Sequence, residues 1–357
     1  MYKAFLNNSI FFNTDSDDEA LELTSASVTF EAGSAGSFTF TVPPWNSMYG
    51  SFKQLTGYVD LYRDSELIFS GRVYKEEKDF QNMHKITCEG MLAVLNDTIF
   101  RPTEYSGNLQ KLITTLLSNH NSQVETTRRI QVGKIYVTCS SLQKSFEDYD
   151  TTMSCFQDIV DDYGGYLEVN KRNGTLYLDY IKEYTTKATQ TIELGKNLTG
   201  LTQKSDSDDI VTALIPIGGQ VESASDSSKK ETLTIKSVNG GNDYIQNDTG
   251  IKNYGRITAT KKWNDIKTAS ELLTAAKDYL ETAAAAKVEI NATAVDLSST
   301  DESLAPFKVG QQIYVKSDIH GIARYITCKK QTIDLLNPAK NSITLGDTIT
   351  GYVGRAK

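Results

Sequence analysis

The chain has 357 residues, of which 39% are hydrophobic, and its formal net charge is −8, from 37 Lys and Arg against 45 Asp and Glu. This composition is that of a globular protein with roughly two to four domains, and it excludes a chain that is disordered throughout. Because no run of Lys or Arg exceeds two residues, a surface that grips nucleic acid is not expected.

No stretch approaches the roughly 20 apolar residues that span a bilayer, and Asn interrupts the first residues too early for a signal peptide. We therefore expect a protein that is made in the cytosol and stays there or is assembled there into something larger. The four cysteines are isolated, with no CxxC spacing, and are interpreted as reduced small hydrophobes: Cys88, Cys139, Cys155 and Cys328.

The first hundred residues have the alternation typical of strands. SVTFE and SFTFTVP place Val28 and Phe30, then Phe38, Phe40 and Val42, on one face each, with a turn at 32–36. YVDLYR, LIFSGRVY and HKITCEG continue the pattern. Residues 1–100 are therefore predicted to form a small β-barrel or sandwich.

Residues 101–198 are predicted to form an inserted α+β module. Asp150 is the expected N-cap and Gly164 the expected C-terminal glycine of the second helix, and a hairpin is expected to turn at Asn173-Gly174. Two helical stripes are expected, one of Leu109, Leu112, Ile113, Leu116 and Leu117, the other of Cys155, Phe156, Ile159, Val160 and Tyr163.

The remaining residues are predicted to return to β structure. Residues 199–220 are expected to supply a strand of the barrel region, and 221–262 a small excursion of loops and short strands. Residues 263–357 are expected to hold a helix and a second β-barrel. The helix begins with a capping box, Thr268 with Glu271, and is expected to run to about Ala286.

A hairpin pattern occurs twice, at 52–73 and at 307–326. Val59 and Leu61 match Ile313 and Val315 in strand phase. Asp64 matches Asp318 at the turn, Arg72 matches Arg324, and the second turn is expected to be two residues shorter. After each hairpin comes a further predicted strand, called the closing strand: KITCEG (85–90) after the first and SITLGD (342–347) after the second. We predict a mainly β fold with an α+β insertion and two similar small β-barrel domains; the alternative is two unrelated β domains.

No constellation of reactive residues is recognisable. His84, His120 and His320 lie far apart, so a zinc site or a His-based triad is not expected, and His320 is interpreted as a solvated turn residue. The acidic stretches 13–19 and 205–209 lack the glycine and distal glutamate of a calcium loop and are expected to be surface loops. Nucleotide-binding and GxSxG motifs are absent from the sequence. We predict no catalytic, cofactor-binding or metal-binding residue and no cofactor.

The C-terminal half resembles the prophage endopeptidase tail family, the tail-associated hub proteins of long-tailed phages and phage-derived particles. The resemblance rests on LIPIGG, YGRITATKKWNDI, LETAAAAKVEINATAVDLS and FKVGQQIYVKSDIHGIARYITCKKQTIDLLNPAKNSITLGD, whose order and spacing agree. The N-terminal β region and the helical insertion fit the family more loosely.

The resemblance implies two tube-type β domains per chain in a homotrimeric ring at the tail tip or baseplate. Six such domains would adapt a sixfold tail tube to a threefold tip. The implied partners are the chain itself, the distal tail or tail tube protein, the tip or spike protein and the tape measure protein, with DNA only in transit. The particle is a phage or a tail-like bacteriocin, assembled in the bacterial cytoplasm.

Many members of the family continue into a peptidoglycan-cleaving domain, whereas this sequence ends soon after the hub region, so a structural component and not an enzyme is expected. Two alternatives remain: a peptidoglycan hydrolase with carboxylates between 101 and 196, and a receptor-binding or glycan-binding tail module. Three chains of charge −8 would bring −24 together. Acidic and neutral polar side chains are therefore expected to line the bore.

Overall fold

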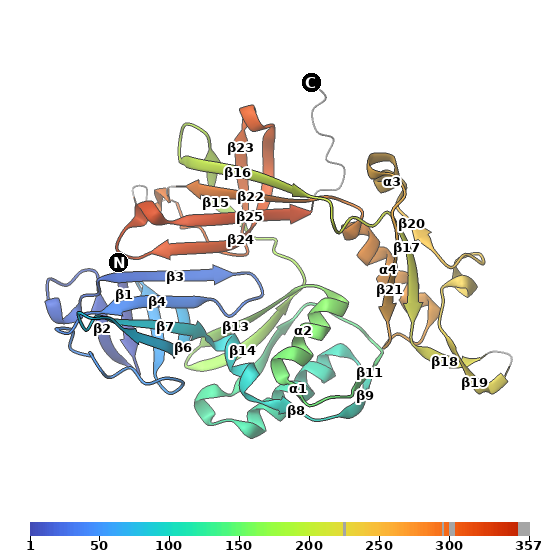
Figure 1. Ribbon diagram of the computed structural model, residues 1–357, viewed down its shortest axis with the longest axis horizontal. Helices are drawn as coiled ribbons and strands as arrows, with labels where there is room; N and C mark the ends of the chain where they lie inside the picture. Colours follow the sequence, from blue (N-terminus) through green and yellow to red (C-terminus); the bar gives the residue numbers. More distant parts are fainter. Residues whose placement is uncertain (224–225, 295, 300–303, 349–357) are drawn as a thin grey trace.

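The computed structural model describes residues 1–357 except 224–225, 295, 300–303 and 349–357. The described residues are mainly β strands, which confirms the coarse fold class expected from the sequence. They form a first β region (1–90), an α+β module (91–186), a second β region (187–206 and 287–348) and an excursion (207–286), arranged as in Figure 1. None of the described helices is long and apolar enough to cross a membrane.

The first β region is antiparallel throughout, in the order β3-β4-β7-β6-β5-β1-β2. Its alternating strands bury one face around phenylalanine side chains such as Phe38 and Phe40, as the sequence predicts. The strands are β1 (Tyr2–Leu6), β2 (Ser9–Asn13), β3 (Ser25–Glu31), β4 (Ser37–Val42), β5 (Tyr58–Arg63), β6 (Glu66–Lys78) and β7 (His84–Gly90), with a short helix η1 (Glu19–Leu21).

The α+β module packs two helices on a three-stranded sheet, and the predicted stripes of both helices enter its core. The N-cap of α2 is Thr151 rather than Asp150, because its side chain accepts the hydrogen bond from the Ser154 N–H. Its elements are η2 (Met91–Asp97), β8 (Ile99–Phe100), β9 (Thr103–Gly107), α1 (Leu109–Gln123), η3 (Thr126–Arg128), β10 (Ile130–Ile135), β11 (Leu142–Phe146), β12 (Asp150–Thr151), α2 (Thr152–Tyr163), β13 (Tyr166–Arg172) and β14 (Thr175–Ile181).

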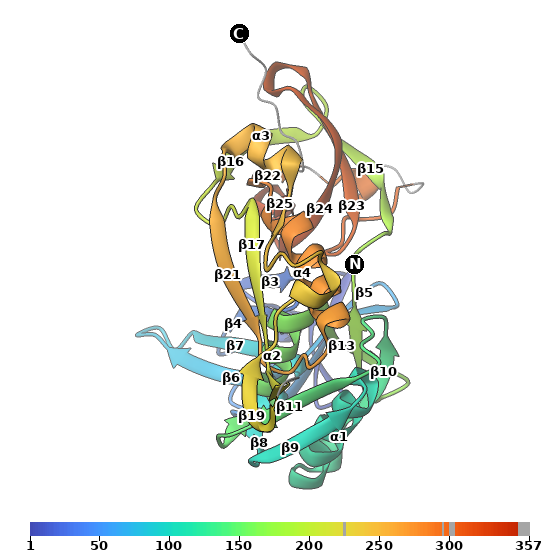
Figure 2. The ribbon, with the colours of Figure 1, turned by 90° about the vertical axis from the view of Figure 1, so that its right-hand side faces the viewer.

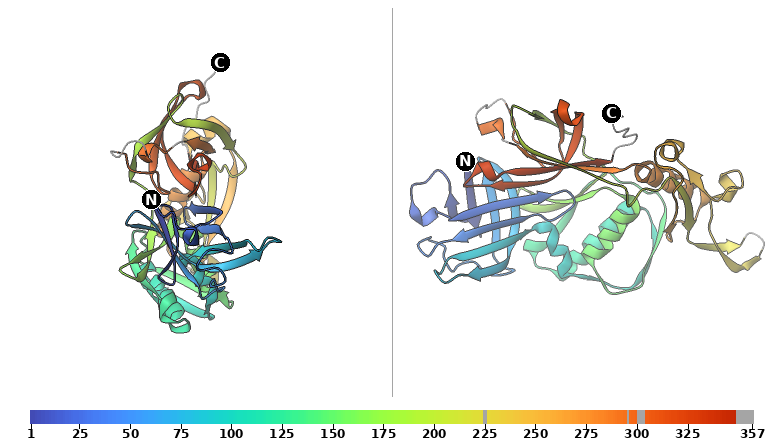
Figure 3. Two further views of the ribbon diagram at one scale, coloured as in Figure 1. Left: turned by 90° about the vertical axis from the view of Figure 1, so that its left-hand side faces the viewer. Right: turned by 45° about the horizontal axis from the view of Figure 1, so that its top comes forward.

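The second β region lies above the first in the left panel of Figure 3 and has the order β16-β22-β25-β24-β23-β15. β15 and β23 run parallel to each other, whereas the strand pairs β16–β22, β22–β25, β25–β24 and β24–β23 are antiparallel. Its elements are β15 (Lys187–Glu193), β16 (Leu198–Asp206), β22 (Lys287–Ala294), η5 (Leu297–Ser299), β23 (Gln312–Ser317), η6 (Asp318–His320), β24 (Ile322–Asp334), η7 (Pro338–Lys340) and β25 (Ser342–Thr348).

The excursion is larger than the sequence indicates. The strand at 213–218, expected in the barrel region, pairs instead with β20 and β21, and the capped helix packs on it. Trp263, Leu272 and Leu280 fill this separate core, which stands at one end of the molecule in Figure 1. Its elements are β17 (Ala213–Gly218), β18 (Gln220–Ser223), β19 (Asp226–Thr232), η4 (Lys236–Val238), β20 (Ile245–Gln246), α3 (Asp248–Tyr254), β21 (Thr258–Trp263) and α4 (Ala269–Ala283).

Neither β region is a closed barrel within the part of the chain that the structure describes. The two regions share one 13-stranded sheet, whose main path ends at β16 and at β2. The first half of β24 pairs with β23. Its last residues extend beyond the end of β23 and pair instead with β3 of the first β region, so the sheet continues and does not close. The predicted barrels are therefore corrected to two open, curved β regions that continue into each other.

Candidate functional site: a continuous sheet with a polar face

The seam between the two β regions is formed by β3 and β24. Five residue pairs run antiparallel from Lys330 opposite Glu31 to Asp334 opposite Ser27. The hydroxyls of Thr29 and Thr332, separated by 303 residues in sequence, lie 3.2 Å apart. Lys330 Nζ lies 3.3 Å from a carboxylate oxygen of Glu31. These contacts join the two β regions edge to edge.

The seam also shares a hydrophobic core. Ile333, near the end of β24, and Leu335, just after it, are buried among the side chains of the first β region. The second β region thus completes the core of the first. The two regions form one structural unit rather than two domains on a flexible linker.

The face of this sheet that points away from the cores is rich in hydroxyl groups. Ser25 donates to Thr41 over 2.8 Å and Thr39 donates to Thr87 over 3.3 Å, so hydroxyls bond to each other across neighbouring strands. The same face carries, on five neighbouring strands, the half-buried or exposed residues Ser25, Ser27, Thr29, Ser37, Thr39, Thr41, Thr87, Thr332, Ser342 and Thr344.

Two pairs of opposite charges lie on this face. Glu31 faces Lys330 across the seam, and Glu77 on β6 is in register with Lys85 on β7. Hydroxyls donate and accept hydrogen bonds without carrying charge, and paired charges leave little net field. Such a face is hydrated, and it offers a passing phosphate backbone few of the unpaired cations that would hold it.

The two β regions repeat the same arrangement of strands. In β3-β4-β7-β6-β5 and in β16-β22-β25-β24-β23, five antiparallel strands follow the same spatial order. β6 and β24 are both 13 residues long. Each has a bulge against its closing strand, between Val73 and Lys75 in one and between Cys328 and Lys330 in the other.

The register tests the residue matches that were expected from the sequence. Val59 and Leu61 are fully buried, as are Ile313 and Val315 at the equivalent positions of β23. The match of Arg72 with Arg324 is wrong: Arg72 pairs with the first residue of β5, whereas Arg324 lies opposite Val315 in the middle of β23. Placed by the bulges, Arg324 is equivalent to Phe69.

The turn lengths also differ from the expectation. Two residues, 64 and 65, separate β5 from β6, whereas four residues, 318–321, separate β23 from β24. The second turn is thus two residues longer, not shorter. The longer turn contains the short helix η6, which ends at Gly321 in a left-handed conformation.

The three histidines lie in different parts of the fold. His84 Nε2 is 3.0 Å from Glu76, and burial lowers the pKa of His84. His120 is buried against the Thr98 hydroxyl and the Arg128 carbonyl, and burial lowers its pKa too. His320 is exposed beside Ser317, as expected for a turn residue.

No group of three or more His, Cys, Asp or Glu side chains that could hold a metal occurs among the described residues. The acidic stretch 13–19 is largely exposed, and Asp18 caps the short helix η1. The described cysteines are free thiols. Burial raises the pKa of Cys155 and Cys328 to about 12 and raises that of Cys88 further, so these thiols are not poised as nucleophiles.

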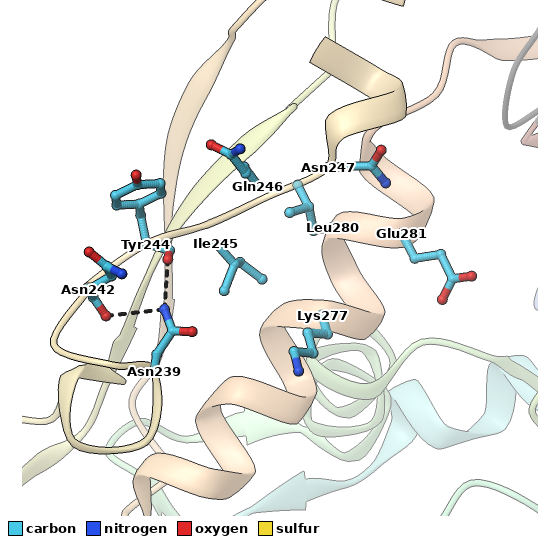
Figure 4. Close-up of a pocket in the computed structure, with 9 residues that line it drawn as sticks. All are labelled: Asn239, Asn242, Tyr244, Ile245, Gln246, Asn247, Lys277, Leu280 and Glu281. Atoms are coloured by element: carbon cyan, nitrogen blue, oxygen red, sulfur yellow. Dashed lines mark hydrogen bonds between the residues drawn. The ribbon is translucent and has the colours of Figure 1, made fainter. Parts of the chain in front are cut away.

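A pocket with a volume of about 580 Å³ lies in the excursion. Figure 4 shows it between α4 and the segment that leads into β20. Asn239 donates to the carbonyls of Tyr244 (2.9 Å) and Asn242 (3.2 Å), and Asn247 caps α3, so these amides hold the loop. The pocket is lined by Asn239, Asn242, Tyr244, Ile245, Gln246, Asn247, Lys277, Leu280 and Glu281.

Buried ion pairs fasten the α+β module to its neighbours. Arg72 on β6 is 3% exposed and contacts Glu89 and Asp97, while Arg128 shares Asp97. Burial lowers the pKa of Arg72, but the hydrogen bonds to Asp97 and Glu89 outweigh this effect and hold its pKa above the usual value. This cluster positions the first β region against the module.

A second cluster joins the α+β module to the excursion. Lys144 lies 3.0 Å from Asp162 in the module and 3.3 Å from Asp265 in the excursion. Burial alone would lower the pKa of Lys144, yet the two carboxylates raise it, so the lysine stays protonated. One lysine thus pairs with a carboxylate from each of the two parts.

Comparison with solved structures shows the same overall fold in phage tail proteins. The 43 kDa tail protein of prophage MuSo2 from Shewanella oneidensis matches with a TM-score of 0.65 and 12% identity, over 97% of each chain. A tail protein from Neisseria meningitidis matches with a TM-score of 0.65 and 12% identity, over 97% of this chain and 96% of that one. Prophage tail protein gp18 from Listeria monocytogenes matches with a TM-score of 0.63 and 13% identity, over 98% of this chain and 95% of that one.

No curated protein matches the chain in sequence. The chain nevertheless shares its overall fold with these phage tail proteins. Residues 186–350 match the model of the prophage endopeptidase tail family. The resemblance expected from the sequence is confirmed.

Proposed function

We propose that the chain is a structural hub of a tail tip or baseplate, a homotrimeric ring that adapts a sixfold tail tube to a threefold tip. The observation that supports it most strongly is the repeat: each chain carries two β regions with the same strand order, joined edge to edge. Three such chains present six similar β regions toward a tube. The α+β module and the excursion, which occur once per chain, keep the other features threefold.

The polar sheet face supports a role in lining the channel for ejection. The hydroxyls of β3, β4, β7 and β24 and the paired charges Glu31 and Lys330 give a surface without net attraction for phosphate. In this proposal the polar face turns to the bore, and the apolar faces stay in the cores of the two β regions. DNA is a passenger and not a ligand.

The proposed partners are the tail tube or distal tail protein on the pseudo-sixfold side, the tip or spike protein on the threefold side, and the tape measure protein within the channel. The protein acts as a scaffold without catalysis. The alternative of a peptidoglycan hydrolase predicts that the purified chain clears bacterial cell walls in zymography, and that mutation of acids in the α+β module abolishes the clearing.

Mass measurement in solution and negative-stain imaging test the hub proposal. The chain, alone and mixed with the tail tube protein of the same particle, is expected to give rings with the mass of three copies. A chain that stays monomeric under both conditions contradicts the hub.

A further inference from the structure

The internal seam provides a template for contacts between chains. Within one chain, the second half of β24 runs past the end of β23 and pairs with β3. In the first β region, β6 likewise runs past β5, whose first residue lies opposite Arg72. The exposed residues 74–78 of β6 pair with β7 on one side, and no strand in the described part of the chain covers their other side. Figure 2 shows this end of β6 and β7 projecting from the body.

The partner of this edge follows from the repeat. β3 and β16 occupy the same position in their regions. β3 pairs with β4, which pairs with the closing strand β7, and β16 pairs with β22, which pairs with the closing strand β25. The edge of β3 is covered by β24, whereas β16, apart from one bridge between its first residue Leu198 and Leu194, pairs with β22 in the described structure and forms one end of the sheet. Figure 1 shows β16 at the top of the sheet and β6 near its bottom. An open strand edge of this length is a template for pairing with another chain.

We propose that β6 of one chain pairs antiparallel with β16 of a second copy, in the register that β24 and β3 use within the chain. This inference rests on the proposed hub function and specifies its interface. Because the two edges lie on different surfaces of the chain, the contact is head-to-tail, and with the threefold symmetry of the proposed hub it closes into a ring. The seam inside each chain and the seam between chains then alternate, and one continuous sheet surrounds the channel.

The register follows from equivalent residues. Val73 pairs with Cys88, and Cys328 pairs with Leu345, so positions on β24 exceed their equivalents on β6 by 255. Thr332 of the internal seam therefore corresponds to Glu77. Val28 pairs with Phe38 of β4, and Gln203 pairs with Ile290 of β22, the residue equivalent to Phe38. Val28 is therefore equivalent to Gln203, and the next residue, Thr29, is equivalent to Lys204. Thr332 lies opposite Thr29, so Glu77 is placed opposite Lys204 of the second copy.

The charges of this derived pair are complementary. Glu77 and Lys204 are both exposed, and the pair would point to the polar face, where Glu77 already lies in register with Lys85. One glutamate would then stand between two lysines from different chains. Opposite charges at directly facing positions favour a strand pair, whereas like charges there disfavour it. The register was derived from backbone pairing alone, so the charge match is an independent observation.

Disulfide cross-linking tests the pairing. Directly opposed strand residues have Cα atoms about 4.5–5.5 Å apart, within the range of a disulfide, whereas diagonal neighbours about 7–8 Å apart lie beyond it. The variant Glu77→Cys with Lys204→Cys is expected to form covalent dimers and trimers under mild oxidation. The matched control, Glu77→Cys with Thr202→Cys, shifts the register by two residues and is expected to stay uncross-linked.

Charge exchange gives a second test. Glu77→Lys alone and Lys204→Glu alone are each expected to weaken the ring, and the two together are expected to restore it, by the mass of the assembled particle. If the wild-type protein forms three-chain rings but neither cross-link nor rescue occurs, the pairing is refuted and the hub stands. If no ring forms even with the tail tube protein, both proposals fail.

Discussion

Substitution of Ile333 probes whether the second β region stabilises the first. Ile333 is 4% exposed and packs in the core of the first β region, although it belongs to β24. Ile333→Ala removes three carbons, worth about 0.8 kcal/mol each in transfer free energy, and leaves a cavity. We expect the free energy of opening of the first β region to fall by about 3 kcal/mol.

Hydrogen exchange resolves where this loss occurs. A decrease of about 3 kcal/mol corresponds to roughly 100-fold faster exchange of amides that open together with the seam. The acceleration is expected in peptides from β3 and β4, more than 290 positions before the substitution, while α4 in the excursion stays unchanged.

The matched control is Ile343→Ala on the neighbouring strand β25. Ile343 is 7% exposed and lies in the core of the second β region. Its substitution is expected to accelerate exchange mainly in β22 and β25. If Ile333→Ala accelerates exchange only in β24 and β25 and leaves β3 and β4 protected, the shared core does not couple the two regions.

Three further predictions follow from the buried charges, the histidines and the polar face. Arg72→Met leaves Glu89 without its buried partner and is expected to lower the free energy of unfolding in urea by about 3 kcal/mol. The control Lys308→Ala breaks an exposed pair with Glu66 and is expected to cost less than about 1 kcal/mol. Burial lowers the pKa of His120 in the folded state. The stability that the neutral imidazole contributes is therefore fully present above the unfolded-state pKa of about 6.5, and it is lost as the pH falls through the lower pKa of the folded state. His120→Gln should flatten this decline, and an unchanged pH profile would contradict it. The assembled ring should not bind duplex DNA in gel shifts, and salt-sensitive binding, or a bore ringed by Lys and Arg, would refute the neutral channel.

The sequence predicts most individual strands and helices because their patterns are local. The alternation around Phe38 and Phe40 and the capping box of Thr268 with Glu271 depend only on neighbouring residues, and both are confirmed. The phase of the repeated hairpins was also predictable, since buried Val59 and Ile313 recur at the same spacing within their strands. The family resemblance came from longer segments of the second half.

Nonlocal pairing could not be read from the sequence. The seam depends on Thr29 and Thr332, two hydroxyls in ordinary strand patterns with no signal that links them. An apolar strand such as 213–218 looks the same in the excursion as in a barrel, so its sheet was misplaced. The match of Arg72 with Arg324 failed because residue type was compared without the bulges that set the register.

The central claim is that the two β regions of three chains form one ring, and an electron cryomicroscopy map of the assembled chain with its tail tube protein tests it most directly. The account predicts three copies around one channel, with a continuous sheet in which the internal seam of β24 and β3 alternates with a seam of β6 and β16 between chains. The hydroxyl-rich face should line the bore. A different copy number, or β regions of neighbouring chains that do not meet around the channel, would contradict it.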